Sequence, residues 1–137
     1  MEPRRILIVD DDSTVARILV RVFERAGFSA TAARNGKQAL ALLSNEHFDA
    51  MICDIQMPEM DGRELCQELS SSGPYFPGCT FIVTSRSEEE ERSWVAEHPN
   101  VGLVEKPVSP KQIMRLVSQE LGVEIDGHPS DRDQRAA

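Results

Sequence analysis

Long hydrophobic runs are missing from this 137-residue sequence. No stretch of 18 consecutive apolar residues occurs, which predicts that no helix crosses a membrane. Near the amino terminus only four apolar residues, 6–9, follow the basic pair Arg4 and Arg5, too few for a signal peptide. We therefore expect a cytoplasmic protein.

Basic residues and paired cysteines are also scarce. Lys and Arg total 15 against 23 Asp and Glu, which gives a formal net charge of −8. Nucleic acids and anionic membranes bind clustered positive charge, so we expect neither as a partner, whereas the acidic balance fits binding of a cation. Cys53, Cys66 and Cys79 are widely spaced and odd in number. They argue against a disulfide framework or a zinc site and predict buried, reduced thiols.

Short apolar runs alternate with amphipathic stretches, and this alternation predicts the fold. Strands are expected at residues 6–9, 28–33, 48–53, 80–83 and 101–104. Helices are expected after them at residues 13–26, 39–45, 61–70, 87–97 and 110–121, the second following a turn at Asn35-Gly36. The pattern indicates an α/β protein, with a five-stranded parallel sheet and five helices on both faces. In the strand order 2-1-3-4-5, the ligand crevice lies beyond the carboxyl ends of strands one and three.

The pattern ends before the carboxyl terminus. We expect one domain over residues 1–122 and a polar, flexible tail over residues 123–137. In the first helix, apolar residues at helical spacing are expected to form the buried stripe. These are Val15, Ile18, Leu19, Val22, Phe23 and Ala26.

Carboxylates follow two strands that this order makes neighbours. Asp10 and Asp11 end the first strand, and Asp54 ends the third. Three carboxylates at one edge repel one another and raise at least one pKa unless a cation neutralises them. Oxygen ligands in a small space suit Mg²⁺, whereas Asp12 is expected to cap the following helix.

Two further polar side chains end the fourth and fifth strands. Thr84 follows residues 80–83, and Lys106 follows residues 101–104. A hydroxyl and an ammonium group beside a metal-bound carboxylate would stabilise a phosphoryl group carried on that carboxylate. The pattern predicts Asp54 as the nucleophile of an acyl phosphate.

Four groups of residues together resemble the receiver domain of bacterial two-component response regulators, over residues 5–122. They are Ile8-Val9-Asp10-Asp11 with Ser13-Thr14, Cys53-Asp54-Ile55-Gln56-Met57-Pro58-Glu59-Met60-Asp61-Gly62, Val83-Thr84-Ser85 and Glu105-Lys106-Pro107. The D-x-x-M-P-x-x-D-G run is highly specific, and the strand-end Thr and the Lys-Pro pair corroborate it. The resemblance implies a flavodoxin-like receiver fold like that of single-domain chemotaxis receivers.

The resemblance also implies a phosphorylation-dependent signalling switch rather than an enzyme with its own substrate. Asp54 would accept a phosphoryl group from a sensor histidine kinase or a phosphotransfer protein, and self-phosphorylation and self-dephosphorylation there would be the only catalysis. Asp10, Asp11, Asp54 and the backbone carbonyl of Gln56 would bind Mg²⁺. The Lys106–Pro107 bond would be cis. Phosphorylation would pull on Thr84 and change the face made by the fourth helix, fifth strand and fifth helix, where a partner binds.

One position departs from the family pattern. Leu103 stands three residues before Lys106, where relatives commonly carry an aromatic residue, so the usual aromatic rotamer switch is absent. Trp94 in the fourth helix is a candidate substitute on the output surface, although packing over the core is the favoured interpretation of this residue.

Two other positions are expected to tune the phosphoryl group. Gln56 and Arg86 lie two residues after Asp54 and Thr84, positions that flank the phosphoryl group in the family, so we expect them to set its lifetime. The residues after Gly122 are too few for an output domain. The sequence is therefore either a single-domain regulator or a piece of a longer protein.

Two alternatives compete with this interpretation. Residues 10–14 match the D-x-D-x-T signature of haloacid dehalogenase-like phosphatases, with Asp10 as nucleophile and Asp12 as acid/base. That alternative lacks the acidic pair expected on a strand after Lys106, and it leaves the run from Asp54 to Gly62 unexplained. The second alternative is a receiver-like interaction module that is never phosphorylated. It is disfavoured because such modules usually lose one of the acidic residues, the Thr or the Lys.

Overall fold

A single parallel sheet organises the chain. The computed structural model describes residues 2–57, 59–71, 73, 75–85 and 89–123. Within them the strands follow the order β2-β1-β3-β4-β5, and all four neighbouring pairs are parallel, as predicted. The strands are β1 (Arg5–Val9), β2 (Ser29–Ala33), β3 (Ala50–Asp54), β4 (Cys79–Thr84) and β5 (Val101–Glu105). The helices are α1 (Ser13–Arg25), α2 (Gly36–Asn45), α3 (Gly62–Ser71), α4 (Glu89–Ala96) and α5 (Pro110–Leu121).

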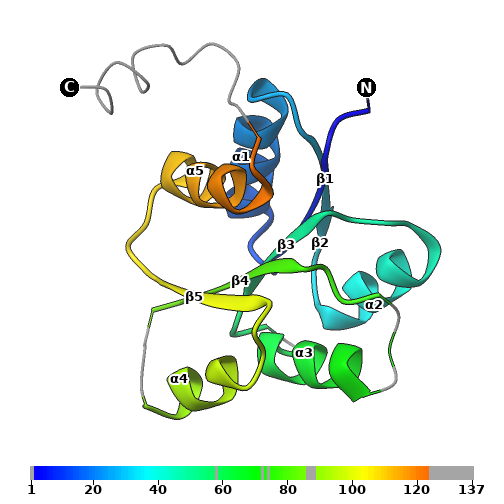
Figure 1. Cartoon of the computed structure of the whole chain (residues 1–137), viewed down its shortest axis with the longest axis vertical. Helices are drawn as coiled ribbons and strands as arrows, with labels where there is room; N and C mark the ends of the chain where they lie inside the picture. Colours follow the sequence, from blue (N-terminus) through cyan, green and yellow to red (C-terminus); the bar gives the residue numbers. More distant parts are fainter. Residues whose placement is uncertain (1, 58, 72, 74, 86–88, 124–137) are drawn as a thin grey trace.

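Helices cover the two faces of the sheet unequally. Figure 1 shows α1 and α5 on one face and α2, α3 and α4 on the other. Side chains of β1 alternate between these layers, because successive residues of a strand point to opposite faces. Ile6 and Ile8 join the cluster under α1 and α5, whereas Leu7 and Val9 join the cluster under α2, α3 and α4. The apolar run in β1 is buried on both faces because helices lie on both.

Local capping fixes where several helices begin and end. Asp12 caps α1, as predicted, and Gly122 ends α5 in the left-handed conformation with φ of 67°. Ser109 and Gln112 form the expected capping box at the start of α5. The turn expected at Asn35 is in fact a helix start, because its Oδ1 accepts the Gln38 N–H at 2.9 Å and so caps α2.

The expected buried stripe of α1 is wrong at two positions. Leu19 and Phe23 are buried, but Val15 and Ile18 are 40% and 47% exposed. Ala16 is buried in their place. Residues of a helix are about 100° apart, so Ile18 lies on the flank of the helix, away from the face centred on Leu19. The spacing of apolar residues alone does not show which of them lie beyond the part of α1 that packs against the sheet and α5.

The cysteines are free and buried, as predicted. Burial raises the pKa of the Cys66 thiol to about 12 and that of Cys79 to about 11, so neither is a thiolate near neutral pH. No helix among the described residues is both long and apolar enough to cross a bilayer. Residues 124–137 of the expected tail lie outside the described residues.

Candidate functional site

Three carboxylates meet at the carboxyl edge of the sheet. Strands β1 and β3 are neighbours, with Val9 opposite Cys53, so the residues that follow them lie side by side. One oxygen atom each of Asp10, Asp11 and Asp54 lies within 4.8 Å of the others. Across the described residues, no other group of three acidic, His or Cys side chains is arranged in this way. The prediction that these carboxylates converge is confirmed.

Backbone hydrogen bonds hold Asp10 in place. Its N–H donates to the carbonyl of Ala33 at 3.0 Å, which joins it to the end of β2. Its Oδ1 accepts the N–H of Asp12 at 2.9 Å. Asp12 in turn accepts the N–H groups of Thr14 and Val15 at 3.0 and 3.3 Å. The first helix turn therefore orients Asp10, while Asp12 is committed to capping.

Asp54 is positioned by the close approach of α3. A Cβ atom added at Gly62 would lie 2.9 Å from the carbonyl oxygen of Asp54, so only glycine fits there without movement. The N–H of Gly62 donates to Ile55 O at 3.0 Å, and the Ile55 N–H donates to Val83 O at 3.2 Å. These contacts attach the end of β3 to both α3 and β4.

The loop between β3 and α3 is fixed by its own polar groups. Asp61 Oδ1 accepts the Glu64 N–H at 2.8 Å, and Glu64 Oε1 accepts the Asp61 N–H at 3.3 Å, so Asp61 caps α3. Gly36 donates its N–H to Met60 O at 3.2 Å, and an added Cβ there would lie 2.6 Å from the Met60 side chain. The roles of Gly36 and Gly62 were not predicted from the sequence, although glycine at a helix start was an available signal.

Lys106 reaches the carboxylates from across the sheet. Its Nζ lies 3.3 Å from Asp54 Oδ1. Its backbone N–H donates to Thr84 O at 2.7 Å, which brings it to the end of β4. Thr84 itself is 2% exposed and comes one residue after Val83, the partner of Asp54 in the strand register. The Lys106–Pro107 bond is cis, as the resemblance implied.

Burial controls the protonation of this edge. The pKa of Asp10 is raised, first by burial and then by the charges of Asp54 and Asp11, although the Asp12 N–H and Lys106 oppose the shift. Burial also raises the pKa of Asp54, against the lowering effect of the Lys106 charge and hydrogen bond. The expected rise occurs, but loss of solvent contributes more to it than repulsion does.

The donor set fits a divalent cation. Carboxylate oxygens within 4.8 Å of one another can share one ion, and a small hard cation such as Mg²⁺ completes its shell with water or phosphate oxygen. Such an ion would relieve the cost of burying Asp10 and Asp54 in their charged forms. The ammonium group of Lys106 lies 3.3 Å from Asp54 Oδ1 and can neutralise a second anionic group there.

The remaining predicted residues lie near this edge, in the core under α4, or outside the described part of the chain. Gln56 is exposed, two residues after Asp54. Leu103 is half-buried and packs in the same cluster as Trp94, which is 4% exposed. Packing of Trp94 in the core, the favoured interpretation, is therefore confirmed. Arg86 lies outside the described residues.

Comparisons with known proteins agree on one family. The family model described as "Response regulator receiver domain" matches residues 6–118. A response regulator named MprA from Mycolicibacterium vanbaalenii is 39% identical over 90 residues, which is 66% of this chain and 38% of that protein. MprA of Mycobacterium sp. strain KMS is 40% identical over the same shares. The match thus spans well under half the length of these relatives.

Solved structures agree as well. The CheY-like receiver domain protein of Methanospirillum hungatei JF-1 has 27% identity and a TM-score of 0.77, over 88% of this chain and 94% of that one. The receiver domain of a signal transduction histidine kinase from Syntrophus aciditrophicus has 30% identity and a TM-score of 0.75, over 87% and 90%. CheY4 of Vibrio cholerae, at 24% identity and a TM-score of 0.76 over 85% and 98%, shares the fold.

The family has a shared way of working. Receiver domains are signalling domains that interact with a histidine kinase or a phosphotransfer protein. They typically use Mg²⁺ at an acidic pocket, and a cluster of Asp residues occurs in this chain too. The fold, the matched residues 6–118 and the relatives together establish that this chain belongs to the family of response regulator receiver domains.

Proposed function

We propose that Asp54 is the phosphoryl acceptor of this receiver. The observation that carries the proposal is the position of its carboxylate, which lies within 4.8 Å of oxygen atoms of Asp10 and Asp11 and 3.3 Å from the ammonium group of Lys106. An oxygen of Asp54 would attack the phosphorus of a phosphohistidine. A P–O bond forms as the P–N bond breaks, and the bonding electron pair leaves with the donor's imidazole.

Each neighbouring side chain has a role in this transfer. Asp10, Asp11, Asp54 and the backbone carbonyl of Gln56 would hold Mg²⁺, which when bound supplies positive charge against the phosphoryl oxygens. Lys106 would pair with a phosphoryl oxygen in place of Asp54 Oδ1. The Thr84 hydroxyl would donate a hydrogen bond to another phosphoryl oxygen. Self-phosphorylation from small donors and self-dephosphorylation would use the same groups.

The phosphatase alternative is disfavoured by two contacts. It requires Asp12 as acid/base, but Asp12 Oδ1 already accepts two backbone N–H groups as the cap of α1. It also requires Asp10 as nucleophile, whereas Lys106 pairs with Asp54. The alternative of a module that is never phosphorylated would be supported by the loss of one of the site residues. The acids, Thr84 and Lys106 are all present, so the sequence does not favour it.

The phosphodonor would dock over the amino end of α1. Val15 and Ile18 are two of the three exposed large hydrophobic residues in the described part of the chain, and they lie in the first two turns of α1, the helix that follows Asp11. Exposed apolar side chains beside a reactive edge are suited to burial against a partner. The proposed partner is a sensor histidine kinase or a phosphotransfer protein. Direct binding to nucleic acid or to a membrane is not proposed, because the net charge is −8. Three free, buried cysteines support a reducing, cytoplasmic setting.

Output would use the face made by α4, β5 and α5. Thr84 ends β4, and α4 is the next helix in the chain. A movement of Thr84 toward a phosphoryl group would therefore move the segment after β4 and change the position of α4. Leu103 takes the place of the aromatic residue common in relatives. Residues 1–122 would form this working unit. Gln56 and Arg86 would set the lifetime of the phosphoryl group, through their positions beside Asp54 and Thr84.

Intact-mass analysis tests the proposal. The protein is incubated with acetyl phosphate and Mg²⁺, and Asp54→Asn is treated in parallel. We expect one phosphoryl adduct on the wild type, its loss when Mg²⁺ is removed, and none on Asp54→Asn. Asp12→Asn, which changes the acid next to the cluster but keeps a capping side chain, should still be phosphorylated. An adduct that persists in Asp54→Asn overturns the assignment of the acceptor.

A further inference from the structure

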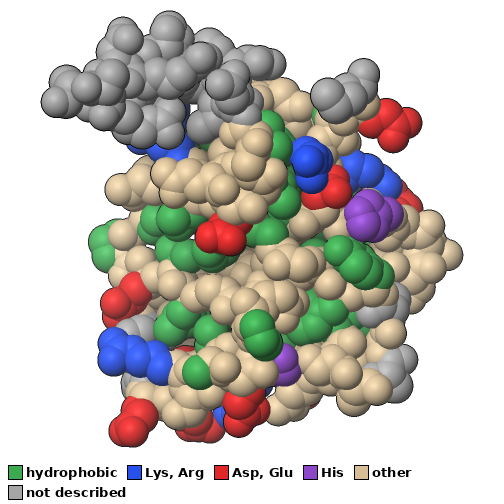
Figure 2. All heavy atoms as spheres, viewed as in Figure 1, with side chains coloured by type: hydrophobic (Ala, Val, Ile, Leu, Met, Phe, Trp, Pro, Cys, Tyr) green, Lys and Arg blue, Asp and Glu red, His purple; other side chains and the backbone are tan. Residues whose placement is uncertain are grey.

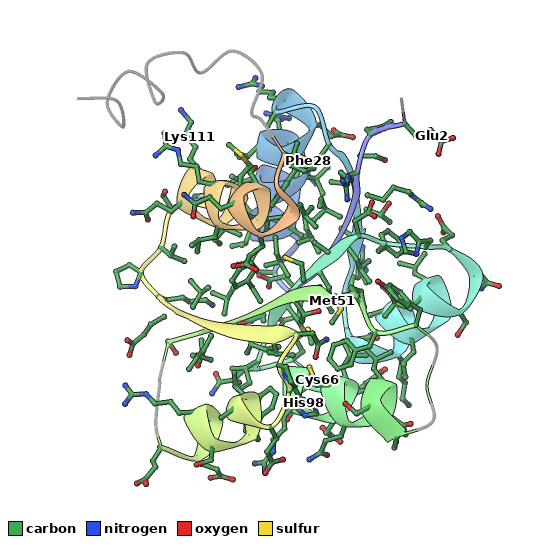
Figure 3. All side chains as sticks on the ribbon, viewed as in Figure 1. Glu2, Phe28, Met51, Cys66, His98 and Lys111 are labelled. Atoms are coloured by element: carbon green, nitrogen blue, oxygen red, sulfur yellow. The ribbon has the colours of Figure 1, made fainter. Side chains whose placement is uncertain are left out.

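Side chains tie α4 to α3 near both ends of α4. In the first turn of α3, Arg63 donates from Nη1 to Oε1 of Glu90 at 2.7 Å. Beyond the other end of α4, His98 Nδ1 lies 3.1 Å from the Ser70 hydroxyl of α3. Figure 3 shows His98 between the two helices. The position of α4 is thus linked to α3 by polar contacts.

Arg63 sits where α4 presents two carboxylates. Its guanidinium carbon lies 6.0 Å from the centre of the Trp94 ring, and this ring is buried. Glu90 and Glu91 are four and three residues before Trp94, so both share its side of the helix. Figure 2 shows acidic side chains gathered along the lower edge of the view, where α4 lies. The guanidinium group over this ring therefore contacts Glu90 and faces the side of α4 that also carries Glu91.

The contact leaves one buried donor and one buried acceptor without a partner in the described part of the chain. Arg63 Nε and Glu91 Oε2 are both buried, and neither has a hydrogen-bond partner among the described residues. Buried polar atoms are rarely left unpaired, because the loss of water is not compensated. Arg63 has five N–H donors, of which the Glu90 contact uses one. The unused pair indicates a second arrangement in which α4 shifts slightly and Glu91 meets Arg63.

We propose that Arg63 is a positioning residue with two partners, Glu90 in the unphosphorylated domain and Glu91 when Asp54 is phosphorylated. The proposal rests on the proposed function of Asp54, because phosphorylation is what shifts the balance. Thr84 links that site to α4 along the chain. A small shift between two packed arrangements would exchange the partners, since Glu90 and Glu91 share the side of α4 that Arg63 approaches. The exchange gives this receiver a contact on α4 that can adopt two states. Strand β5 cannot supply one in the usual way, because Leu103 stands where relatives commonly carry an aromatic residue.

Beryllofluoride, an analogue of the phosphoryl group, tests the exchange. It is titrated with Mg²⁺ into the full chain while the emission of Trp94, the only tryptophan, is recorded. A ligand that favours one state binds more tightly when the competing state is weakened. Glu90→Gln should therefore raise beryllofluoride affinity by roughly two- to fivefold, and Glu91→Gln should lower it by a similar factor, the range expected for partly exposed ion pairs. In an Arg63→Gln background both effects should vanish.

Glu89→Gln provides the matched control. It removes the same charge from the same helix turn, but Glu89 is exposed and has no such contact with Arg63. Its affinity should stay within twofold of the wild type. If Glu90→Gln and Glu91→Gln both match Glu89→Gln, or shift the affinity in the same direction, the exchange is overturned while the role of Asp54 stands. If the wild type does not bind beryllofluoride, the exchange and the proposed function both fall.

Discussion

The ammonium group of Lys106 lies 3.3 Å from Oδ1 of Asp54 and so links β5 to β3, two strands separated by β4. The link depends on backbone geometry, because the Lys106 N–H donates to Thr84 O at 2.7 Å and fixes the chain at the end of β4. The lysine thus counters the effect of burial on the pKa of Asp54. It is also available to an anionic group added to that carboxylate.

Removal of the lysine charge should make Asp54 harder to ionise. In Lys106→Ala the pKa of Asp54 should rise further, because the charge and the hydrogen bond that lower it are both lost. The measurement is an NMR titration of the Asp54 carboxyl carbon. Phosphorylation by acetyl phosphate should also slow by roughly tenfold. This loss of rate is smaller than the loss expected on removal of a fully buried hydrogen-bond donor, because the Lys106 side chain is 45% exposed. Lys111→Ala, which removes a lysine from α5, should leave both quantities unchanged. An unaltered Asp54 titration in Lys106→Ala would contradict the ion pair.

Asp10 should make stability depend on pH in a defined direction. Its folded-state pKa lies above the ordinary value of 3.8, so the folded protein holds this proton more tightly than the unfolded chain does. Its contribution therefore favours folding below the unfolded value and is lost as the pH rises through the folded value. Asp10→Asn should raise the free energy of unfolding at pH 7, by roughly 1 kcal/mol, and have little effect near pH 3.

Urea unfolding without divalent cations, at both pH values, checks this sign. The same variant at low pH is its own control, because Asp10 is then largely protonated in both states. Asparagine keeps an oxygen for the Asp12 N–H, so the hydrogen bond that orients the loop can remain. Equal effects at the two pH values would show that the charge of Asp10 is not the cause.

Strand ends were predictable from the sequence, whereas contacts between helices were not. Asp10, Asp54, Thr84 and Lys106 each follow a short apolar run, and one rule about strand order brings them together. The contact between Arg63 and Glu90 joins residues 27 positions apart on two helix surfaces, and no periodicity encodes it. Non-local packing of this kind depends on how helices lie on the sheet, which hydrophobic spacing leaves open.

Helix faces show the same limit. The apolar spacing of α1 correctly placed Leu19 and Phe23 in the core but could not reveal that Val15 and Ile18 remain exposed. Whether an apolar side chain of α1 is buried depends on whether it reaches the cluster that α1 shares with α5, and Val15 and Ile18 are not part of this cluster. The start of α2 was misassigned because Asn35-Gly36 is a common turn pair, and only the capping bond to Gln38 distinguishes the helix start.

Magnesium should stabilise the protein through Asp10 and Asp11. A ligand that binds only the folded state adds about 2.7 kcal/mol at one hundred times its Kd. Urea unfolding with and without Mg²⁺ should show this gain, and EDTA should reverse it. Asp11→Asn should lose most of the gain, because it removes one of the three clustered carboxylates. Asp12→Asn should keep it, since Asp12 serves as the cap of α1. A similar loss in both variants would indicate diffuse binding to acidic residues instead of one site.

Gly62 should be the glycine that the site tolerates least. In Gly62→Ala the new Cβ would lie 2.9 Å from Asp54 O and 3.1 Å from Ile55 Cα, and both are backbone atoms that cannot rotate away. Overpacking of this kind costs about 1–3 kcal/mol in the free energy of unfolding. Gly78→Ala is the matched control, because the nearest atom to its new Cβ is the Tyr75 hydroxyl at 4.0 Å. Urea unfolding should show a loss for Gly62→Ala and a change within about 0.5 kcal/mol for Gly78→Ala. Because α3 packs closely against the end of the strand that carries Asp54, Gly62→Ala should also weaken Mg²⁺ binding. An unchanged Mg²⁺ affinity would show that the Asp54 carboxylate is positioned independently of α3.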